Sequence, residues 1–417
     1  MKKKILYIHH GKGLGGAPLS LLYLIQALDK SKYQPIVLFL HDSPVLEVYK
    51  NLDIYKNKTI DVIGPVNLYD FPHTKIWWFR WYHVLSFLRC TSDTLLTLVF
   101  GARYWLKKIE PDIVHLNTSS LIAWGKVAKK MGIPVVWHIR EPLADGYLGL
   151  RKKLITNCVK KHAHTIVSIC KNDACPWEKL SKTHVIYNTV DQKIFDHRIS
   201  PESFLAKYNL ENSNQDSNIL RAPKILFLGG LSQEKGTLVI LSVFKKLLEV
   251  MPNAKLLLAG YFPEQSNRSI LISSLIKKLF PAHKYTKQVF KILASIKESV
   301  IFLGPILDVP GAMAASSVVV FPATIGHFAR PIIEAGFMKK PVVASCLAPL
   351  DELVIDEKTG FLVDPKAIDI WVQKLTLLLI NQAYNKHMGQ QAYEFCRVNF
   401  GLEMHISKIE KIYEKIL

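Results

Sequence analysis

Short apolar runs alternate with longer segments of helical periodicity along most of the chain. Each run ends at a glycine, a proline or a polar residue, and the segment after it repeats its apolar positions every three to four residues. Runs that are apolar on both faces are typical of strands in parallel sheets, which helices cover on both sides. We therefore predict α/β architecture with doubly wound parallel sheets. The predicted strands are residues 4–9, 35–40, 112–116, 134–137, 165–169, 224–228, 255–259, 300–303, 318–321 and 341–344.

The pattern divides into two halves at a polar stretch rich in serine and asparagine, Glu211–Asn218. A chain of 417 residues is also longer than a single core usually supports. We expect two Rossmann-like domains, residues 1–200 and 201–399. The last segment, residues 400–417, has the pattern of a basic amphipathic helix that can pack back on the first domain.

Composition bounds the class of protein and its compartment. Apolar residues make up 49% of the chain, so disorder is not favoured. Six cysteines are scattered, as in a reducing compartment. The start has no long apolar core or cleavage site, and prolines and glycines interrupt the longest charge-free run, residues 309–329. We expect a cytoplasmic protein that is peripheral on the inner face of the cell membrane.

The net charge of +20 fits three kinds of partner: nucleic acid, an anionic membrane, or phosphorylated substrates. A generally basic proteome would also produce it. We find no zinc-finger, RRM or KH pattern, so nucleic acid is not an expected partner.

The most informative segment is Phe321–Pro365. A buried strand ends at Pro322, a loop follows, and Pro331 opens a helix. The pattern places Glu334 in the first turn of that helix, beyond the carboxyl end of a strand, where open α/β sheets bind ligands. A carboxylate at a helix start can instead serve only the helix dipole.

The residues Glu334, Ala335, Gly336 and Pro341–Ala344 resemble the nucleotide-sugar motif of retaining, family-4 glycosyltransferases. The family carries another glutamate eight positions earlier, where this chain has Gly326. The resemblance implies the GT-B fold, in which two Rossmann-like domains face each other across a cleft. It also implies a nucleotide-diphosphate sugar as substrate, with Glu334 holding the ribose hydroxyls.

Two further segments of the second half extend the resemblance. Residues 224–236, KILFLGGLSQEKG, resemble the opening of the donor domain, and Lys235 matches the lysine that neutralises the donor diphosphate. Gly230 stands where the family often has an arginine, and Arg330 could supply that charge or pair with an acid. The resemblance assigns donor binding to Gly15, Gly16, Gly230, Lys235, Ile306, His327, Phe328, Ala329, Arg330 and Glu334.

The first loop allows two interpretations. Residues 11–16, GKGLGG, contain a G-x-G-x-x-G pattern between a strand and a helix, and Asp42 follows the second strand. That arrangement is the dinucleotide fingerprint. The same glycines suit a tight turn whose amides approach a phosphate. Gly15 and Gly16 match the glycine pair of family-4 glycosyltransferases, and the second half favours that interpretation.

His138 is the candidate catalytic residue of the first half, together with Lys235 of the second. It lies at the end of a predicted strand in VVWHIRE, residues 135–141, and family members often have a histidine there near the reacting sugar. Arg140 and Glu141 could orient it by hydrogen bonds. A satisfied structural histidine is the alternative.

Metal chemistry is not expected. His162, His164, Cys170 and Cys175 do not have the spacing of a zinc site. The sequence has no Asp-x-Asp at a strand end, and the resemblance implies a reaction without metal or cofactor.

Residues 76–106 are aromatic and apolar with interspersed arginines. They suit a helix that lies at an anionic membrane surface, with Trp77, Trp78, Trp81 and Trp105 at headgroup depth. Ordinary packing on the first domain is the alternative.

The predicted function is a hexosyltransferase-like enzyme. It would transfer a sugar to a lipid-linked glycan in bacterial surface polysaccharide or glycolipid synthesis, with retention of anomeric configuration. Two alternatives stay open: a GT-B nucleotide-sugar epimerase or hydrolase, and a non-catalytic sugar-nucleotide-binding subunit.

Overall fold

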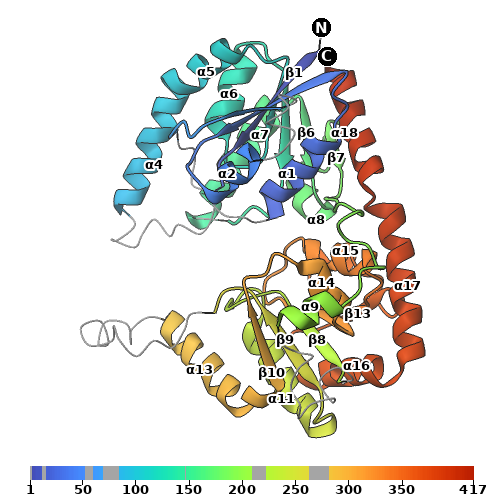
Figure 1. The fold of residues 1–417 in the computed structure, drawn as a ribbon. Coiled ribbons are helices and arrows are strands. Elements are labelled where there is room, and N and C mark those ends of the chain that lie inside the picture. Colours follow the sequence, from blue (N-terminus) through green and yellow to red (C-terminus); the bar gives the residue numbers. More distant parts are fainter. Residues whose placement is uncertain are drawn as a thin grey trace. The chain divides into compact units, whose positions relative to one another are not determined.

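The computed structural model describes residues 2–11, 16–51, 60–68, 84–145, 147–208, 222–262 and 281–417. It divides into two compact units, one of residues 1–190 with 400–417 and one of residues 191–399 (Figure 1). Each unit is a parallel sheet with helices on its faces, so the prediction of two doubly wound α/β domains is confirmed. The sequence places the boundary after residue 200, whereas the contacts of the structure place it after Val190.

The first sheet has seven parallel strands in the order β3-β2-β1-β4-β5-β6-β7. Their middle members are buried on both faces, as the continuous apolar runs predict. The strands are β1 (Lys3–His9), β2 (Tyr33–Phe39), β3 (Asp61–Ile63), β4 (Ile113–Leu116), β5 (Val135–Ile139), β6 (Thr165–Ser168) and β7 (Thr183–Val185).

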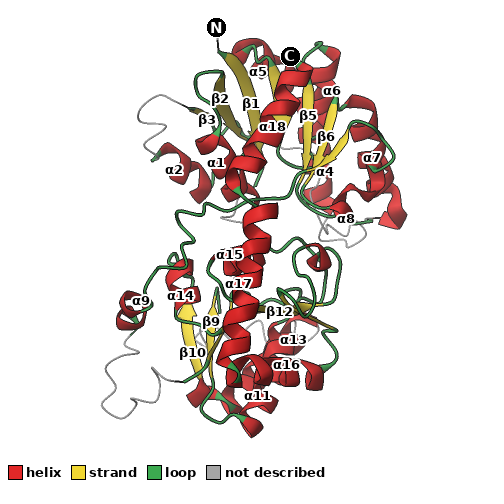
Figure 2. Cartoon of the chain, turned by 90° about the vertical axis from the view of Figure 1, so that its right-hand side faces the viewer, coloured by secondary structure: helices red, strands yellow, loops and turns green. Residues whose placement is uncertain are grey.

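Two helical layers cover this sheet. On one face, α1 (Gly16–Ala27), α2 (Pro44–Lys50) and the C-terminal α18 (Leu402–Ile416) share a core with β1 (Figure 2). The core of the other face takes in residues of α5 (Ala102–Ile109), α6 (Ile122–Lys130) and α7 (Leu150–His162). A π-helical turn, Thr97–Gly101, joins α5 to the preceding α4 (Val84–Leu96), and α8 (Lys171–Ala174) follows β6.

The second sheet has six parallel strands in the order β10-β9-β8-β11-β12-β13. They are β8 (Lys224–Phe227), β9 (Lys255–Ala259), β10 (Val300–Gly304), β11 (Val318–Phe321), β12 (Val342–Ser345) and β13 (Gly360–Val363). The described helices of this unit are α9 (Glu202–Lys207), α11 (Thr237–Val250), α13 (Pro281–Ser295), α14 (Val309–Ala314), α15 (Arg330–Phe337), α16 (Ile368–Ile380) and α17 (Gln382–Asn399).

The predicted strands all occur, each within two residues of its expected ends. Sequence analysis did not predict β3, β7 and β13. β3 and β7 have three residues each, which is too short for an apolar run to stand out. β13 has four residues, as several predicted strands do, so its length does not explain why it was missed. The polar stretch Glu211–Asn218 lies outside the described residues.

Candidate functional site

The candidate site of the second unit is built at the carboxyl ends of β8 and β11, which are neighbours in the sheet. The loop after β8 is hydrogen-bonded to the loop after β11: the Thr324 amide donates to the Glu234 carbonyl (2.9 Å) and its hydroxyl to the Gln233 carbonyl (2.8 Å). Gly236 packs directly on the backbone of Pro322, where a β-carbon would clash. The two segments that carry Lys235 and Glu334 therefore meet at one edge of the sheet.

Lys235 lies in the turn before α11, and its side chain is exposed. Its backbone amide donates to the Ser232 hydroxyl (3.2 Å), which fixes the turn rather than the ammonium group. Desolvation by the surrounding turn lowers the pKa of Lys235. No acid among the described residues forms an ion pair with this lysine. The ammonium group is thus available for an anion.

Thr237 holds the same turn from inside, and sequence analysis missed it. Its buried hydroxyl donates to the Gly230 carbonyl (2.6 Å) and accepts from the Ser232 amide (2.9 Å). One threonine at the start of α11 therefore closes the loop that runs from Gly230 to Lys235. A threonine after a glycine is too common a pattern to have marked this role in the sequence.

Glu334 is buried in α15 and paired with Arg330. The Arg330 Nε donates to the Glu334 carboxylate over 2.6 Å, one helical turn away. Burial raises the pKa of Glu334, and the Arg330 charge opposes that shift. The Nη1 of Arg330 is also buried and has no hydrogen-bond partner among the described residues.

One detail of the prediction for Glu334 is wrong. Helix α15 begins at Arg330, with a proline in its first turn as predicted, but Glu334 lies beyond that turn. The helix starts one residue before the proline, so Glu334 is the fifth residue of the helix and its carboxylate is buried. The expectation that Arg330 could pair with a surface acid also changes, because its partner is this buried carboxylate.

The two departures from the family pattern have steric reasons. Gly230 has a φ of +59°, and a β-carbon there would lie 2.9 Å from the Tyr261 amide nitrogen. Gly326 packs against the carbonyl of Ala348, which a β-carbon would overlap. Neither the arginine nor the first glutamate of the family fits these positions without moving the backbone.

The remaining donor-binding candidates lie in loops at the same sheet edge. Ile306 is half-buried between β10 and α14. His327, Phe328 and Ala329 precede α15, and the His327 ring contacts Phe321 at the end of β11, with ring centroids 5.2 Å apart. In the first unit, Gly16 begins α1 with open space around it, whereas Gly15 and most of the G-x-G-x-x-G pattern lie outside the described residues.

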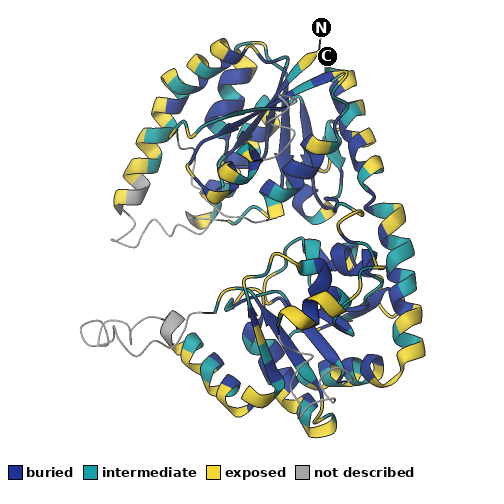
Figure 3. Ribbon diagram, in the orientation of Figure 1, coloured by how far each residue is buried: buried dark blue, intermediate teal, exposed yellow. Residues whose placement is uncertain are grey.

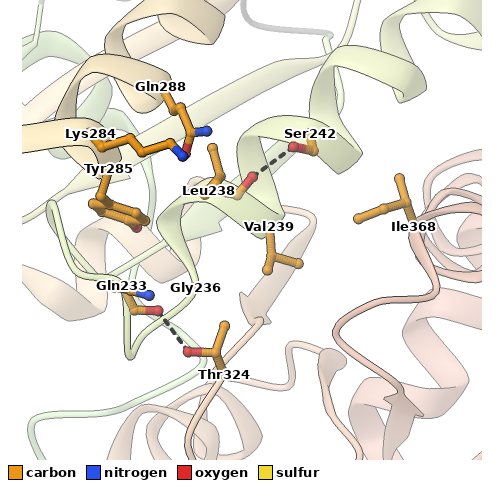
Figure 4. Close-up of a pocket in the computed structure, with 10 residues that line it drawn as sticks. All are labelled: Gln233, Gly236, Leu238, Val239, Ser242, Lys284, Tyr285, Gln288, Thr324 and Ile368. Carbon is orange, nitrogen blue, oxygen red and sulfur yellow. Dashed lines mark hydrogen bonds between the residues drawn. The ribbon is translucent and has the colours of Figure 1, made fainter. Parts of the chain in front are cut away.

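A pocket of about 430 Å³ lies beside the start of α11 (Figure 4). Side chains of α11 and α13 face into it, among them Ser242, Lys284 and Gln288. The Gln233–Thr324 hydrogen bond forms one end of its lining. The pocket adjoins the loop that carries Lys235, but neither Lys235 nor Glu334 is among its described lining residues.

In the first unit, His138 is completely buried on β5. Its Nδ1 is 3.1 Å from Nε2 of His115 on β4, and its own Nε2 has no hydrogen-bond partner among the described residues. Burial lowers the pKa of His138 well below its ordinary value, and the Arg140 charge adds to the shift. The side chain is therefore a neutral imidazole.

The expected orienting partners of His138 are wrong. Glu141 accepts hydrogen bonds from the Thr118 hydroxyl (2.7 Å) and the Ser119 amide (2.9 Å). Arg140 donates to the side-chain carbonyls of Asn117 and Asn188. The hydrogen bonds of both residues are thus made with other partners than His138. His115, on the adjacent strand, takes that place.

A second polar group, which the sequence did not reveal, surrounds Arg140. Asn117 joins Arg140 to His9, whose Nδ1 lies 3.2 Å from the asparagine amide nitrogen. Burial lowers the pKa of Arg140 to about 10 and that of His9 to about 3. His9 Nε2 and Arg140 Nη2 have no described partner. These residues follow or end β1, β4 and β5, so they gather at the carboxyl edge of the first sheet.

Among the described residues, no group of three or more histidine, cysteine, aspartate or glutamate side chains could hold a metal ion. In the same part of the chain, no helix is long and apolar enough to cross a membrane.

Comparisons with known proteins identify the family. Residues 210–395 match the family model described as Glycosyl transferases group 1, and residues 14–193 match that of Glycosyltransferase Family 4. The crystal structure of HepE from Anabaena in complex with UDP has the same fold, with a TM-score of 0.74 at 18% identity over 99% of this chain and 100% of that one. The chain belongs to the family-4-like glycosyltransferases of the GT-B fold.

The curated relatives are matched over only part of their length. Trehalose synthase of Thermococcus litoralis is 25% identical over 175 residues, which are 42% of this chain and 40% of the relative. D-inositol 3-phosphate glycosyltransferase of Corynebacterium efficiens is 25% identical over 228 residues, 52% of this chain and 50% of the relative. The chain thus spans half or less of these relatives.

Proposed function

We propose that this protein transfers a sugar from a nucleoside-diphosphate sugar, bound at the carboxyl edge of the second sheet, to an acceptor. The observation that carries the proposal is Lys235, an exposed cation without a described ionic partner, on a loop hydrogen-bonded to the one that leads to Glu334. HepE, which shares the fold, has been solved with UDP and with UDP-glucose. The exposed lysine and the ligands bound in HepE both favour a nucleotide sugar as donor.

In this proposal each charged group has one task. Lys235 neutralises the diphosphate as it leaves, because a fixed cation stabilises developing negative charge without reorganisation. Glu334 accepts hydrogen bonds from the ribose hydroxyls while Arg330 holds the carboxylate in place. His138, near the end of β5, is the proposed catalytic residue of the first unit. We further propose retention of anomeric configuration and no requirement for a metal.

A screen of nucleotide sugars tests the donor. Bound donor raises the melting temperature by mass action, so UDP and at least one nucleotide sugar should stabilise the protein, with or without EDTA. Transfer should then require an acceptor and survive EDTA. Turnover without any acceptor would instead select the epimerase or hydrolase. Donor binding without turnover would select the binding subunit.

We propose that the acceptor is presented at an anionic membrane surface. The outer face of α4, the π-turn and α5 exposes seven large apolar residues (Figure 3). Leu85 is 80% exposed and Phe100 is 69% exposed. The exposed apolar residues are Leu85, Leu88, Leu95, Leu96, Val99, Phe100 and Tyr104.

The opposite side of the same segment is ordinary core packing. Ala102, Leu106 and Ile109 are buried in the core beneath the first sheet. The core-packing alternative therefore accounts for the buried face of this helical segment. It does not account for the apolar residues on the exposed face. Trp77, Trp78 and Trp81 lie outside the described residues, whereas Trp105 packs against the core.

Basic residues lie on the same helices as the exposed apolar face and favour an anionic membrane as its partner. Arg89, Arg103, Lys107 and Lys108 are all exposed on these helices. An apolar strip with cations beside it matches the boundary of an anionic bilayer, where each cation contributes about 1 kcal/mol and apolar contact about 25 cal/mol per Å². Salt weakens the first contribution and not the second.

Sedimentation with anionic vesicles tests this surface. Phe100→Ser should weaken binding at every salt concentration, while Val250→Ser, an equally exposed apolar residue of the second unit, should not. Arg103→Gln with Lys107→Gln should remove mainly the salt-sensitive part. A wild-type protein that stays in the supernatant at low salt would refute the membrane proposal and leave the donor proposal intact.

A further inference from the structure

A second cavity of the second unit lies at the amino edge of its sheet, the edge opposite to the loop that carries Lys235. Its volume is about 550 Å³, within the range of sites for small molecules. Residues at or just before the starts of β8, β11 and β12 line it, together with the end of α16 and the first turn of α17. Because the strands are parallel and β8 has four residues, roughly 13 Å of strand separates the two edges.

The described lining of this cavity is basic and contains no acid. Its lysines are Lys224, Lys339, Lys340 and Lys386. The Lys339 ammonium lies over the ring of Tyr393, 5.1 Å from its centroid, so three cations are left for the cavity. Desolvation lowers the pKa of Lys224 and lowers that of Lys340 to about 8, and no acidic side chain among the described residues offsets this effect.

Backbone carbonyls hold two of these ammonium groups in place without neutralising them. Lys340 Nζ donates to the carbonyls of Ala314 (3.0 Å) and Ser316 (2.7 Å), at the end of α14. Lys224 Nζ donates to the Ala222 carbonyl over 3.1 Å. An ammonium has three hydrogens, so Lys340 can serve one more acceptor. Capping of α14 explains the bonds of Lys340, but it does not explain why other lysines gather around the same cavity.

The first turn of α17 adds to the positive field. The Asn385 side-chain amide donates to the carbonyls of Ser317 (3.0 Å) and Leu378 (3.1 Å), which ties this turn to the start of β11 and the end of α16. Lys386, the next residue, is exposed and forms no ion pair with a described residue. The amino end of an 18-residue helix also carries partial positive charge.

We propose that this cavity binds a small phosphorylated molecule, with Lys224, Lys340 and Lys386 around its phosphate monoester. Such a group carries nearly two negative charges at neutral pH and accepts several hydrogen bonds, which matches clustered ammonium groups without a competing acid. The cavity is larger than a phosphate ion, and Met251 and Leu379 in its lining suit the less polar part of the ligand. The inference does not rest on the proposed sugar transfer.

Isothermal titration of glucose 6-phosphate and of inorganic phosphate tests the site in the full chain. The titrations use Lys235→Ala, so that the loop at the other edge does not contribute, and a constant ionic strength, because salt screens exposed charges. Both probes should bind at one site, and glucose should not. Absence of binding by both phosphates, or equal binding of glucose, would overturn the proposal. The test needs no donor or turnover, so a failed donor proposal leaves it intact.

Three further substitutions in this background locate the phosphate. Lys386→Gln removes an exposed cation, so affinity for glucose 6-phosphate should fall about tenfold or more, the scale of a hydrogen bond to a charged group. Lys340→Gln should lower it at least as much. Lys245→Gln removes the same charge from the exposed side of α11 and should leave affinity unchanged.

Thermal unfolding shows which variants are folded, and Lys386→Gln decides alone if Lys340→Gln does not fold. An affinity that Lys386→Gln leaves unchanged, or that Lys245→Gln lowers equally, would overturn the site.

Discussion

The two units present their candidate site residues in opposite ways. In the second unit the groups are charged, and Lys235 stands exposed on a loop. In the first unit His138 and its neighbour His115 are neutral and lie entirely within the core. A cation that binds a phosphate is more effective when it is exposed and no acidic side chain competes for it. A group that must keep one orientation is held by buried hydrogen bonds, such as the one between His138 and His115.

Removing the charge of the second unit should have the largest effect. We expect Lys235→Ala to lower kcat by about 10²-fold or more, the scale of losing one preorganised group that stabilises a developing anion. Lys245→Ala, a lysine exposed on the outside of α11, should have little effect. Steady-state kinetics measure both. An equal loss of kcat in the two variants would mean that Lys235 contributes only through the net positive charge of the protein and not through contact with the diphosphate.

Restoring the first family glutamate should damage the second unit instead of improving it. Gly326→Glu forces a β-carbon into the Ala348 carbonyl, so we expect a loss of about 1–3 kcal/mol in the free energy of unfolding. Ile325→Glu is the neighbouring control, because Ile325 is half exposed. Denaturant titration compares them. A stable, more active Gly326→Glu would show that the loop accommodates the glutamate.

The first unit should lose less on substitution. His138→Ala removes a single hydrogen-bonding group, worth about 1–2 kcal/mol, so kcat should fall roughly 5- to 30-fold with donor KM nearly unchanged. Thermal unfolding shows whether the variant remains folded. Full kcat in a folded His138→Ala would make the histidine a structural residue.

The smallest expected effect concerns the pH dependence of donor binding. Burial raises the pKa of Glu334, so protonation begins at a higher pH than for an exposed glutamate. As pH falls through that pKa, the carboxylate loses its charge, and affinity for UDP should fall. The difference between wild type and Glu334→Gln isolates this group from the titration of the phosphate. Parallel pH profiles would show that Glu334 does not contact the nucleotide.

The contrast also explains what the sequence could predict. Strands such as β11 and the Pro331 helix start follow from local patterns, and so does the segment that contains Glu334. The buried hydrogen bond between His115 and His138 could not be predicted, because it depends on the register of adjacent strands. Likewise, the Arg330–Glu334 pair needed the exact start of α15. Steric causes at Gly230 and Gly326 appear only when the neighbouring backbone is in place.

Isothermal titration of UDP into the wild-type protein, Lys235→Ala and Glu334→Ala tests the central claim most directly. We predict one site in the wild type and a clear loss of affinity in each variant, about 1–3 kcal/mol for the lost hydrogen bonds of the Glu334 carboxylate. All three proteins should show the same unfolding cooperativity. Unchanged affinity in both folded variants would contradict the assignment of the donor site to the second unit's loops.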